Sequence, residues 1–238
     1  MTSFSILLMG LLLGMKHATD ADHLAAVATL VTRDKTLGQA VRHGVAWGIG
    51  HTIVLSIFAG AVLALGTQIP EPVARWLELL VGIMLLALGI DVIVRLMRRR
   101  VHFHVHEHAG GVRHVHAHSH AGEGAHVLSA HAHEHGRAVP LRSLAVGMVH
   151  GMAGSAAMVL LSLEAVQGPW GGVMYIALFG IGSILGMALL SAAIAVPLRL
   201  SATRMARLHN GLTVAVGAAS CVLGLLVMYR QISFVTGS

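Results

Sequence analysis

The chain has 238 residues, of which 55% are hydrophobic and only 11% are charged. A soluble domain carries about a quarter charged residues, so this composition favours an integral membrane protein and excludes an ordinary soluble domain. The formal net charge of +6 does not indicate a nucleic-acid partner, because the arginines mainly flank apolar runs and the 4% aromatic content offers little for base stacking. The single cysteine excludes an internal disulfide.

Six apolar runs are long enough to cross a bilayer as helices, which requires about 20 mostly apolar residues each. We therefore predict an all-α integral membrane protein with six transmembrane helices. The predicted segments are Ser3–Val31, Ala40–Gly66, Val73–Met97, Leu141–Val166, Gly171–Leu198 and Leu208–Tyr229. A long connection divides the chain into residues 1–97, residues 98–139 and residues 140–238.

Basic residues are unevenly distributed among the connections between these segments. The first, third and fifth connections are rich in Lys and Arg, whereas the second contains only Arg75 and the fourth contains none. Basic connections stay in the cytoplasm, so this pattern predicts that both termini lie outside. The sequence thus predicts a multi-pass protein of the cell (inner) membrane with a cytoplasmic long connection.

The long connection, residues 98–139, contains most of the 18 histidines, and many of them alternate with other residues. The segment has too little apolar content for a core, and we expect it to be disordered although alternation is also typical of a strand. Clustered imidazoles bind divalent metals, which favours metal buffering or sensing over a merely solvated linker. The histidines are His102, His104, His106, His108, His114, His116, His118, His120, His126, His131, His133 and His135.

The two halves of the chain resemble each other weakly, in the same order and at nearly the same offset. The motif Gly14-Met15-x-His17 matches Gly147-Met148-x-His150, and the glycines of the second and third segments match those of the fifth and sixth. Three helices per half would place the second copy upside down, as in many secondary transporters whose site lies between inverted repeats. The alternative is chance similarity between glycine-rich membrane helices.

The first segment contains a run of ionisable residues from Lys16 to His23. Each charge at the centre of a membrane helix costs roughly 2.5–3.5 kcal/mol, so such a cluster requires a compensating partner. His17, Asp22 and His23 carry the imidazole and carboxylate groups that bind divalent first-row metals. No straight helix presents all three on one face, so either the helix is distorted or only a subset binds. Lys16 and Asp20 are predicted as a supporting ion pair.

Two further histidines, His51 and His150, lie in apolar segments at a depth where they can meet His17. With a rise of about 1.5 Å per residue, all three fall in the middle or inner half of a core about 30 Å thick. We predict that they complete the metal site. The alternative for either residue alone is a hydrogen bond between helices.

These residues carry a resemblance to a known family. The run His17-Ala18-Thr19-Asp20-Ala21-Asp22-His23 resembles the signature of the nickel/cobalt transporter (NiCoT) family, and Gly50-His51-Thr52 is similar to its second signature. The longer permeases of that family have eight segments and a later acidic motif, both of which differ here. The chain is most similar to the short, urease-associated branch, and its His-rich connection resembles that of related efflux proteins.

The resemblance implies a secondary transporter of nickel or cobalt ions, with uptake favoured over efflux and a metal site in the middle of the bilayer. The ion would be the substrate, no prosthetic group is expected, and intracellular metal-delivery proteins are possible partners besides the lipid bilayer. A third function is metal sensing or storage through the His-rich connection alone. An enzyme is not expected, because the apolar segments contain no His-Glu-x-x-His motif, and no ATP-binding loop motif is present.

Overall fold

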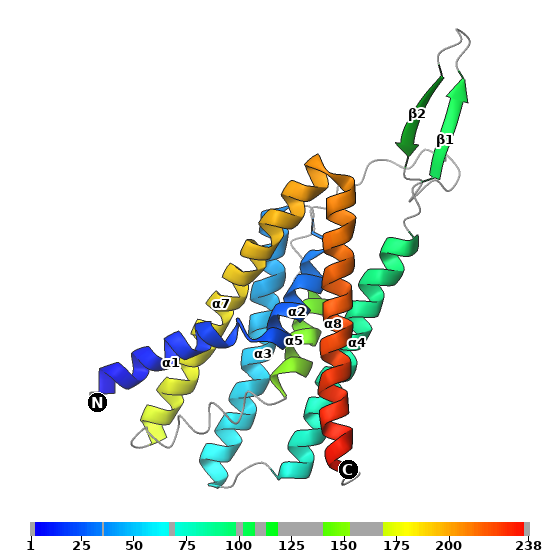
Figure 1. Ribbon diagram of the computed structural model, residues 1–238. Coiled ribbons are helices and arrows are strands. Elements are labelled where there is room, and N and C mark those ends of the chain that lie inside the picture. Colours follow the sequence, from blue (N-terminus) through cyan, green and yellow to red (C-terminus); the bar gives the residue numbers. More distant parts are fainter. Residues whose placement is uncertain are drawn as a thin grey trace, which may run out of the picture.

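The computed structural model describes residues 3–34, 36–66, 70–98, 102–107, 113–118, 140–152 and 169–235. These residues form seven helices and two short strands (Figure 1). The first half contains α1 (Ser3–His17), α2 (Ala21–Val31), α3 (Leu37–Leu65) and α4 (Glu71–Arg98). The second half contains α5 (Leu141–Gly151), α7 (Pro169–Arg204) and α8 (Ala206–Val235), and the strands β1 (His102–Glu107) and β2 (Arg113–His118) lie between the halves.

Four helices are long and apolar enough to cross a membrane, namely α3, α4, α7 and α8. They correspond to the second, third, fifth and sixth predicted segments. The first predicted segment, Ser3–Val31, is not one helix, because the chain leaves helical geometry after His17 and re-enters it at Ala21. Only the start of the fourth segment is described, as α5, and its continuation to Val166 lies outside the described residues.

Helices of the first half pack against helices of the second half. The principal contacts join α4 to α8, α3 to α7, α1 to α7 and α3 to α5. Glycines permit the closest approaches, since a Cβ added at Gly14 would lie 2.1 Å from the carbonyl oxygen of Phe179, and one at Gly147 would lie 2.1 Å from that of Trp47. Backbones that approach this closely at small residues are typical of packing between membrane helices.

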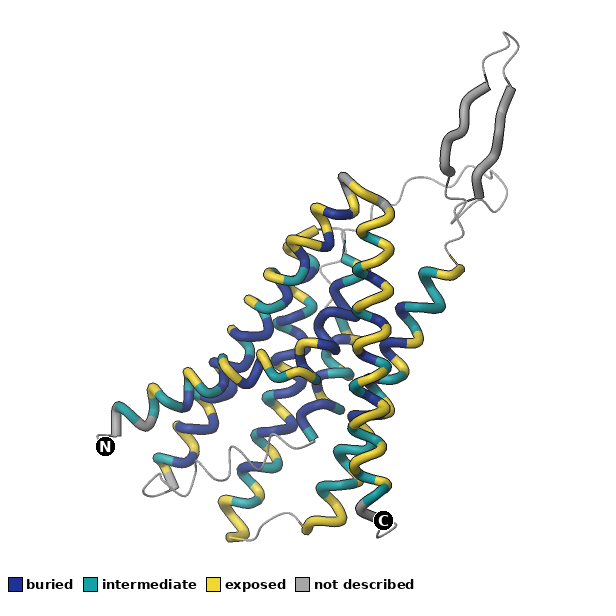
Figure 2. Tube along the Cα trace, in the orientation of Figure 1, coloured by how far each residue is buried: buried dark blue, intermediate teal, exposed yellow. Residues whose placement is uncertain are grey.

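Large apolar side chains occupy both the interior and the outer surface of the helix assembly. Figure 2 shows buried and exposed residues following one another along the helices. Trp47, Leu85 and Met187 are fully buried between helices, whereas Ile57 and Leu189 are 63% and 60% exposed. An extensive apolar exterior is unfavourable in water and favourable in lipid. Together with the four long apolar helices, it indicates a membrane protein.

At one end of the helix assembly three arginines surround the carboxylate of Asp91, and we call this end the Arg-rich end. Asp91 near the end of α4 accepts hydrogen bonds from Arg33 at 2.6 Å, from Arg142 at 2.7 Å and from Arg95 at 3.2 Å. These bonds join the α2–α3 connection, α4 and α5. Helix α3 begins at this end with a capping box at Thr36, whose side chain accepts from the backbone N–H of Gln39.

The prediction that the His-rich connection is entirely disordered was wrong for two short stretches. Strands β1 and β2 pair antiparallel, with His102 opposite His118 and His106 opposite His114. The alternation of histidine with other residues has the two-residue period of a strand, and this local pattern outweighed the low apolar content. The remaining histidines of the connection lie outside the described residues.

Candidate metal site

The site begins at the interruption between α1 and α2. Helix α1 ends at His17, and Asp20 precedes α2 in extended conformation, with φ −61° and ψ 148°. The Asp20 carboxylate makes no capping bond to α2. It lies 2.7 Å from Nδ1 of His17 instead. The interruption turns His17, Asp22 and His23 toward one region, which a straight helix cannot do, so the distorted-helix alternative is the one observed.

Four histidine rings from three separate parts of the chain meet at this interruption. The ring centroid of His23 lies 4.2 Å from that of His17, 5.1 Å from that of His51 and 4.1 Å from that of His150. All four side chains are buried, with exposures between 0% and 5%. The structure therefore brings together every histidine that the sequence analysis predicted as a ligand.

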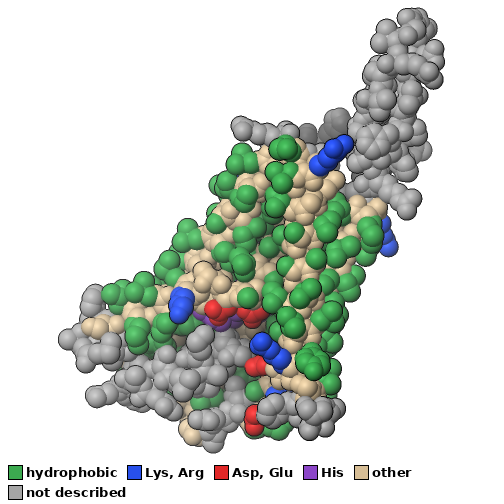
Figure 3. Space-filling view, in the orientation of Figure 1, with side chains coloured by type: hydrophobic (Ala, Val, Ile, Leu, Met, Phe, Trp, Pro, Cys, Tyr) green, Lys and Arg blue, Asp and Glu red, His purple; other side chains and the backbone are tan. Residues whose placement is uncertain are grey.

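Asp22 bridges two of these histidines across the two halves. One carboxylate oxygen lies 3.0 Å from Nδ1 of His23, and the other lies 3.0 Å from Nε2 of His150. The carboxylate thereby orients both rings, and its side chain keeps 38% of its area exposed. Figure 3 shows acidic and histidine side chains meeting at one place on a surface that is otherwise mostly hydrophobic.

Several ring nitrogens in the pocket have no hydrogen-bond partner among the described residues. They are Nε2 of His17, Nε2 of His23, both nitrogens of His51 and Nδ1 of His150. A buried polar group without a partner is rare in native proteins and calls for an explanation such as a bound ion. Potential ligand atoms lie within 4.8 Å of one another in two overlapping groups, His17 with His23 and His51, and Asp22 with His23 and His150.

The predicted supporting ion pair between Lys16 and Asp20 was wrong. Lys16 is exposed, and no ion pair joins it to Asp20, although the structure describes both residues. The prediction assumed that the helix continues through Asp20, which would place the two side chains one turn apart. Because α1 ends at His17, Asp20 pairs with that histidine instead.

The sequence analysis missed a second polar group, at the Arg-rich end of α3. Nδ1 of His43 lies 2.5 Å from Oγ of Ser143, and its Nε2 lies 3.2 Å from a carboxylate oxygen of Asp34. Burial raises the pKa of Asp34 to about 6, against the opposing charges of Arg33 and Arg42. A signal was present, because His43, Trp47 and His51 follow one another at four-residue spacing along α3.

Trp47 was also missed as part of the site. It is fully buried, and its indole ring centroid lies 5.4 Å from that of His23 and 5.5 Å from that of His150. The residue stands one helical turn from both His43 and His51. It therefore closes the pocket on the side facing the Arg-rich end.

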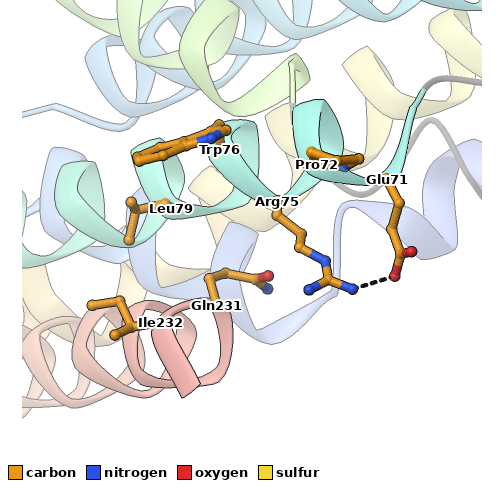
Figure 4. Close-up of a pocket in the computed structure, with 7 residues that line it drawn as sticks. All are labelled: Glu71, Pro72, Arg75, Trp76, Leu79, Gln231 and Ile232. Carbon is orange, nitrogen blue, oxygen red and sulfur yellow. Dashed lines mark hydrogen bonds and ion pairs between the residues drawn. The ribbon is translucent and has the colours of Figure 1, made fainter. Parts of the chain in front are cut away.

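A separate pocket of about 330 Å³ lies between the start of α4 and the end of α8 (Figure 4). Glu71 and Arg75 form an ion pair beside it. The other lining residues are Pro72, Trp76, Leu79, Gln231 and Ile232. This lining lacks imidazole and thiolate groups, so the pocket does not have the donor set of a transition-metal site.

Comparison with known proteins places the chain in a family. It is 38% identical over 227 residues to the urease accessory protein UreH of Bacillus sp. (strain TB-90), which covers 95% of this chain and 91% of that protein. The chain belongs to the UreH family. This membership confirms the predicted urease-associated branch, whereas the wider NiCoT relationship stays a resemblance. No family model matches the chain, and no solved structure matches it.

Proposed function

We propose that this protein is a secondary transporter that takes up nickel ions across the cytoplasmic membrane. The observation that carries the proposal is the buried pocket of His17, His23, His51 and His150 with Asp22, in which ring nitrogens are left without partners. Imidazole and carboxylate groups at this spacing suit a divalent first-row metal. An intramembrane cluster of this kind is a functional site by default.

Inverted repeats would explain how both sides of the membrane gain access to the pocket. The run Trp47-Gly48-Ile49-Gly50 matches Phe179-Gly180-Ile181-Gly182, as Gly14 matches Gly147. The contact of Gly14 with Phe179 and that of Gly147 with Trp47 are therefore equivalent when the halves are exchanged, as the contacts of α1 with α7 and of α3 with α5 are. Rocking of one repeat against the other around a fixed site is the usual mechanism of such transporters. Residues 1–97 and 140–238 would be the two repeats.

The proposed orientation places the Arg-rich end in the cytoplasm, since basic residues are retained on that side. Both termini would then lie outside, and the His-rich connection would lie in the cytoplasm. The urease-related relative is compatible with nickel as the substrate, and cobalt is the alternative ion. Released ions would pass to intracellular delivery proteins, and the connection would buffer them before transfer.

The experiment that tests the proposal is accumulation of radioactive nickel by cells that express the full chain. His23 belongs to both groups of candidate ligands, so His23→Ala should lower accumulation at least about tenfold. His209→Ala is the matched control. That histidine also lies in an apolar helix, but its Nδ1 donates to the Leu198 carbonyl 3.1 Å away. Unchanged accumulation in the His23 variant would refute the site.

The same assay separates uptake from efflux. An importer raises cellular nickel and sensitivity to it, whereas an exporter lowers accumulation and raises tolerance. Net nickel loss that requires the transporter would therefore replace the uptake proposal with the efflux alternative.

A further inference from the structure

A second set of polar side chains lies between the candidate metal site and the Arg-rich end. It consists of Asp34 in the α2–α3 connection, His43 in α3 and Ser143 in α5. The Asp34 side chain is 4% exposed and that of His43 is 27% exposed. The second carboxylate oxygen of Asp34 is buried and has no partner among the described residues.

This set lies on the line that joins the pocket to the Arg-rich end. His43 precedes His51 by eight residues on α3, which corresponds to about 12 Å along the helix, and Ser143 precedes His150 by seven residues on α5, about 10 Å. Helices α3 and α5 pack against each other. On α3 the fully buried Trp47 lies midway between the two polar levels, four residues from His43 and four from His51.

We propose that Asp34 and His43 form a second divalent-metal site, which receives the ion as it leaves the histidine pocket for the cytoplasm. The inference rests on the proposed transport function. It adds a binding step that the family signatures do not contain, because neither residue belongs to those motifs. Ser143 positions the His43 ring and is not itself a ligand.

The geometry of the pair suits a shared ion. Nε2 of His43 and the Asp34 oxygen are 3.2 Å apart. If each lay about 2.1 Å from an ion, the angle at the ion would be about 100°, between the tetrahedral and octahedral values. The unpartnered second oxygen of Asp34 supplies a further donor without breaking any bond among the described residues.

The surroundings make this site weaker than the pocket. It offers one carboxylate and one imidazole, where the pocket offers one carboxylate and four imidazoles. Arg33 and Arg42 act on the Asp34 carboxylate as positive charges. Passage through a protein requires that successive sites bind strongly enough to accept an ion and weakly enough to release it.

Nickel uptake into proteoliposomes that contain the full chain tests the proposal. Asp34→Asn and His43→Gln should each lower the maximal rate about tenfold, with less than a twofold change in the KM for external nickel. A more specific readout comes from Asp34→Cys, because a thiolate prefers soft metals. Cadmium sealed inside the vesicles should inhibit this variant and should not inhibit the wild type, which retains Cys221.

A control variant separates a metal site from a mere contact between the halves. Asp91→Asn weakens the arginine contacts at the Arg-rich end, while Asp34 and His43 stay in place. This variant should keep at least half of the wild-type rate. A rate as low as that of Asp34→Asn in this control, or no cadmium inhibition of Asp34→Cys, would overturn the second site. Absence of nickel uptake by the wild type would instead refute the transport function.

Discussion

The close contact of α5 with α3 at Gly147 lies one helical turn before His150, and it can be perturbed by a single methyl group. A Cβ at this residue would lie 2.1 Å from the Trp47 carbonyl oxygen and 2.4 Å from Cδ1 of its ring. Ordinary contact begins at 3.4 Å, so the backbones must separate by about 1.3 Å, the difference between 3.4 and 2.1 Å. Overpacking of this kind costs about 1–3 kcal/mol.

Gly147→Ala should therefore destabilise the purified protein and weaken nickel binding together. His150 lies one turn further along α5, and its bond to Asp22 is only 3.0 Å long, so a shift above 1 Å breaks it. Losing such an orienting bond typically lowers metal affinity about 10–100-fold. Thermal unfolding and nickel titration in detergent measure both effects.

Gly211→Ala in α8 is the matched control for this prediction. A Cβ there meets nothing within 4 Å, and alanine is a better helix former than glycine by up to about 1 kcal/mol. We expect this variant to be at least as stable as the wild type, with unchanged nickel affinity. If Gly147→Ala behaved in the same way, the contact would not position His150, and the reasoning from the close approach would be wrong.

Three further predictions concern the His-rich connection, external pH and Asp34. Deleting residues 101–135 should leave most of the nickel uptake intact, and complete loss of uptake would favour a sensing or storage function instead. Ligand imidazoles must be unprotonated to bind metal, so uptake should fall at acidic external pH, and a rise would contradict ligation by histidine. Because the folded pKa of Asp34, about 6, exceeds its ordinary value of 3.8, folded protein binds this proton more tightly. The free energy of unfolding should thus decline as the pH rises from 3.8 to about 6. Thermal unfolding scans at several pH values should show a smaller decline for Asp34→Asn.

Much of the candidate site followed from the sequence because charge inside an apolar segment is conspicuous. His17, Asp22 and His23 stood out by their cost in a membrane, and His51 and His150 by their depth. The position of the helix interruption did not follow. Residues Ala18 to Asp20 contain neither proline nor glycine, so no strong helix-breaking residue marks the interruption. Asp20 pairs with His17, three residues earlier, where a continuous helix would favour Lys16 as its partner. The prediction that Asp20 pairs with Lys16 was wrong because it assumed a helix that continues through Asp20.

The group of polar side chains at the Arg-rich end could not be predicted either, because its members are far apart in the sequence. Asp34, His43 and Ser143 come from three elements, and each residue alone is ordinary for the end of a membrane helix. Their meeting depends on the packing of α3 against α5, which is possible because Gly147 lets the backbones approach. Sequence separation of about 100 residues between His43 and Ser143 hides such a contact from any local pattern.

A substitution at His51 should change metal binding and stability in opposite directions. It is fully buried, and neither ring nitrogen has a partner among the described residues. An unsatisfied buried polar group costs about 1–3 kcal/mol. His51→Leu removes this cost while nearly filling the same volume, so the metal-free variant should unfold at a higher temperature than the wild type. It should also lose most of the stabilisation that nickel gives.

His150→Leu is the matched opposite, because Nε2 of His150 bonds the Asp22 carboxylate. Its removal leaves one oxygen of a partly buried charge without that donor, so the metal-free variant should unfold at a lower temperature than the wild type. The His-rich connection is the same in both variants, so its own nickel binding cancels in the comparison. Equal destabilisation by the two substitutions would mean that His51 is satisfied in the metal-free protein, and the pocket would then lose its main indication of a bound ion. Opposite signs would show that the fold keeps His51 at a cost in stability that only ligand binding offsets.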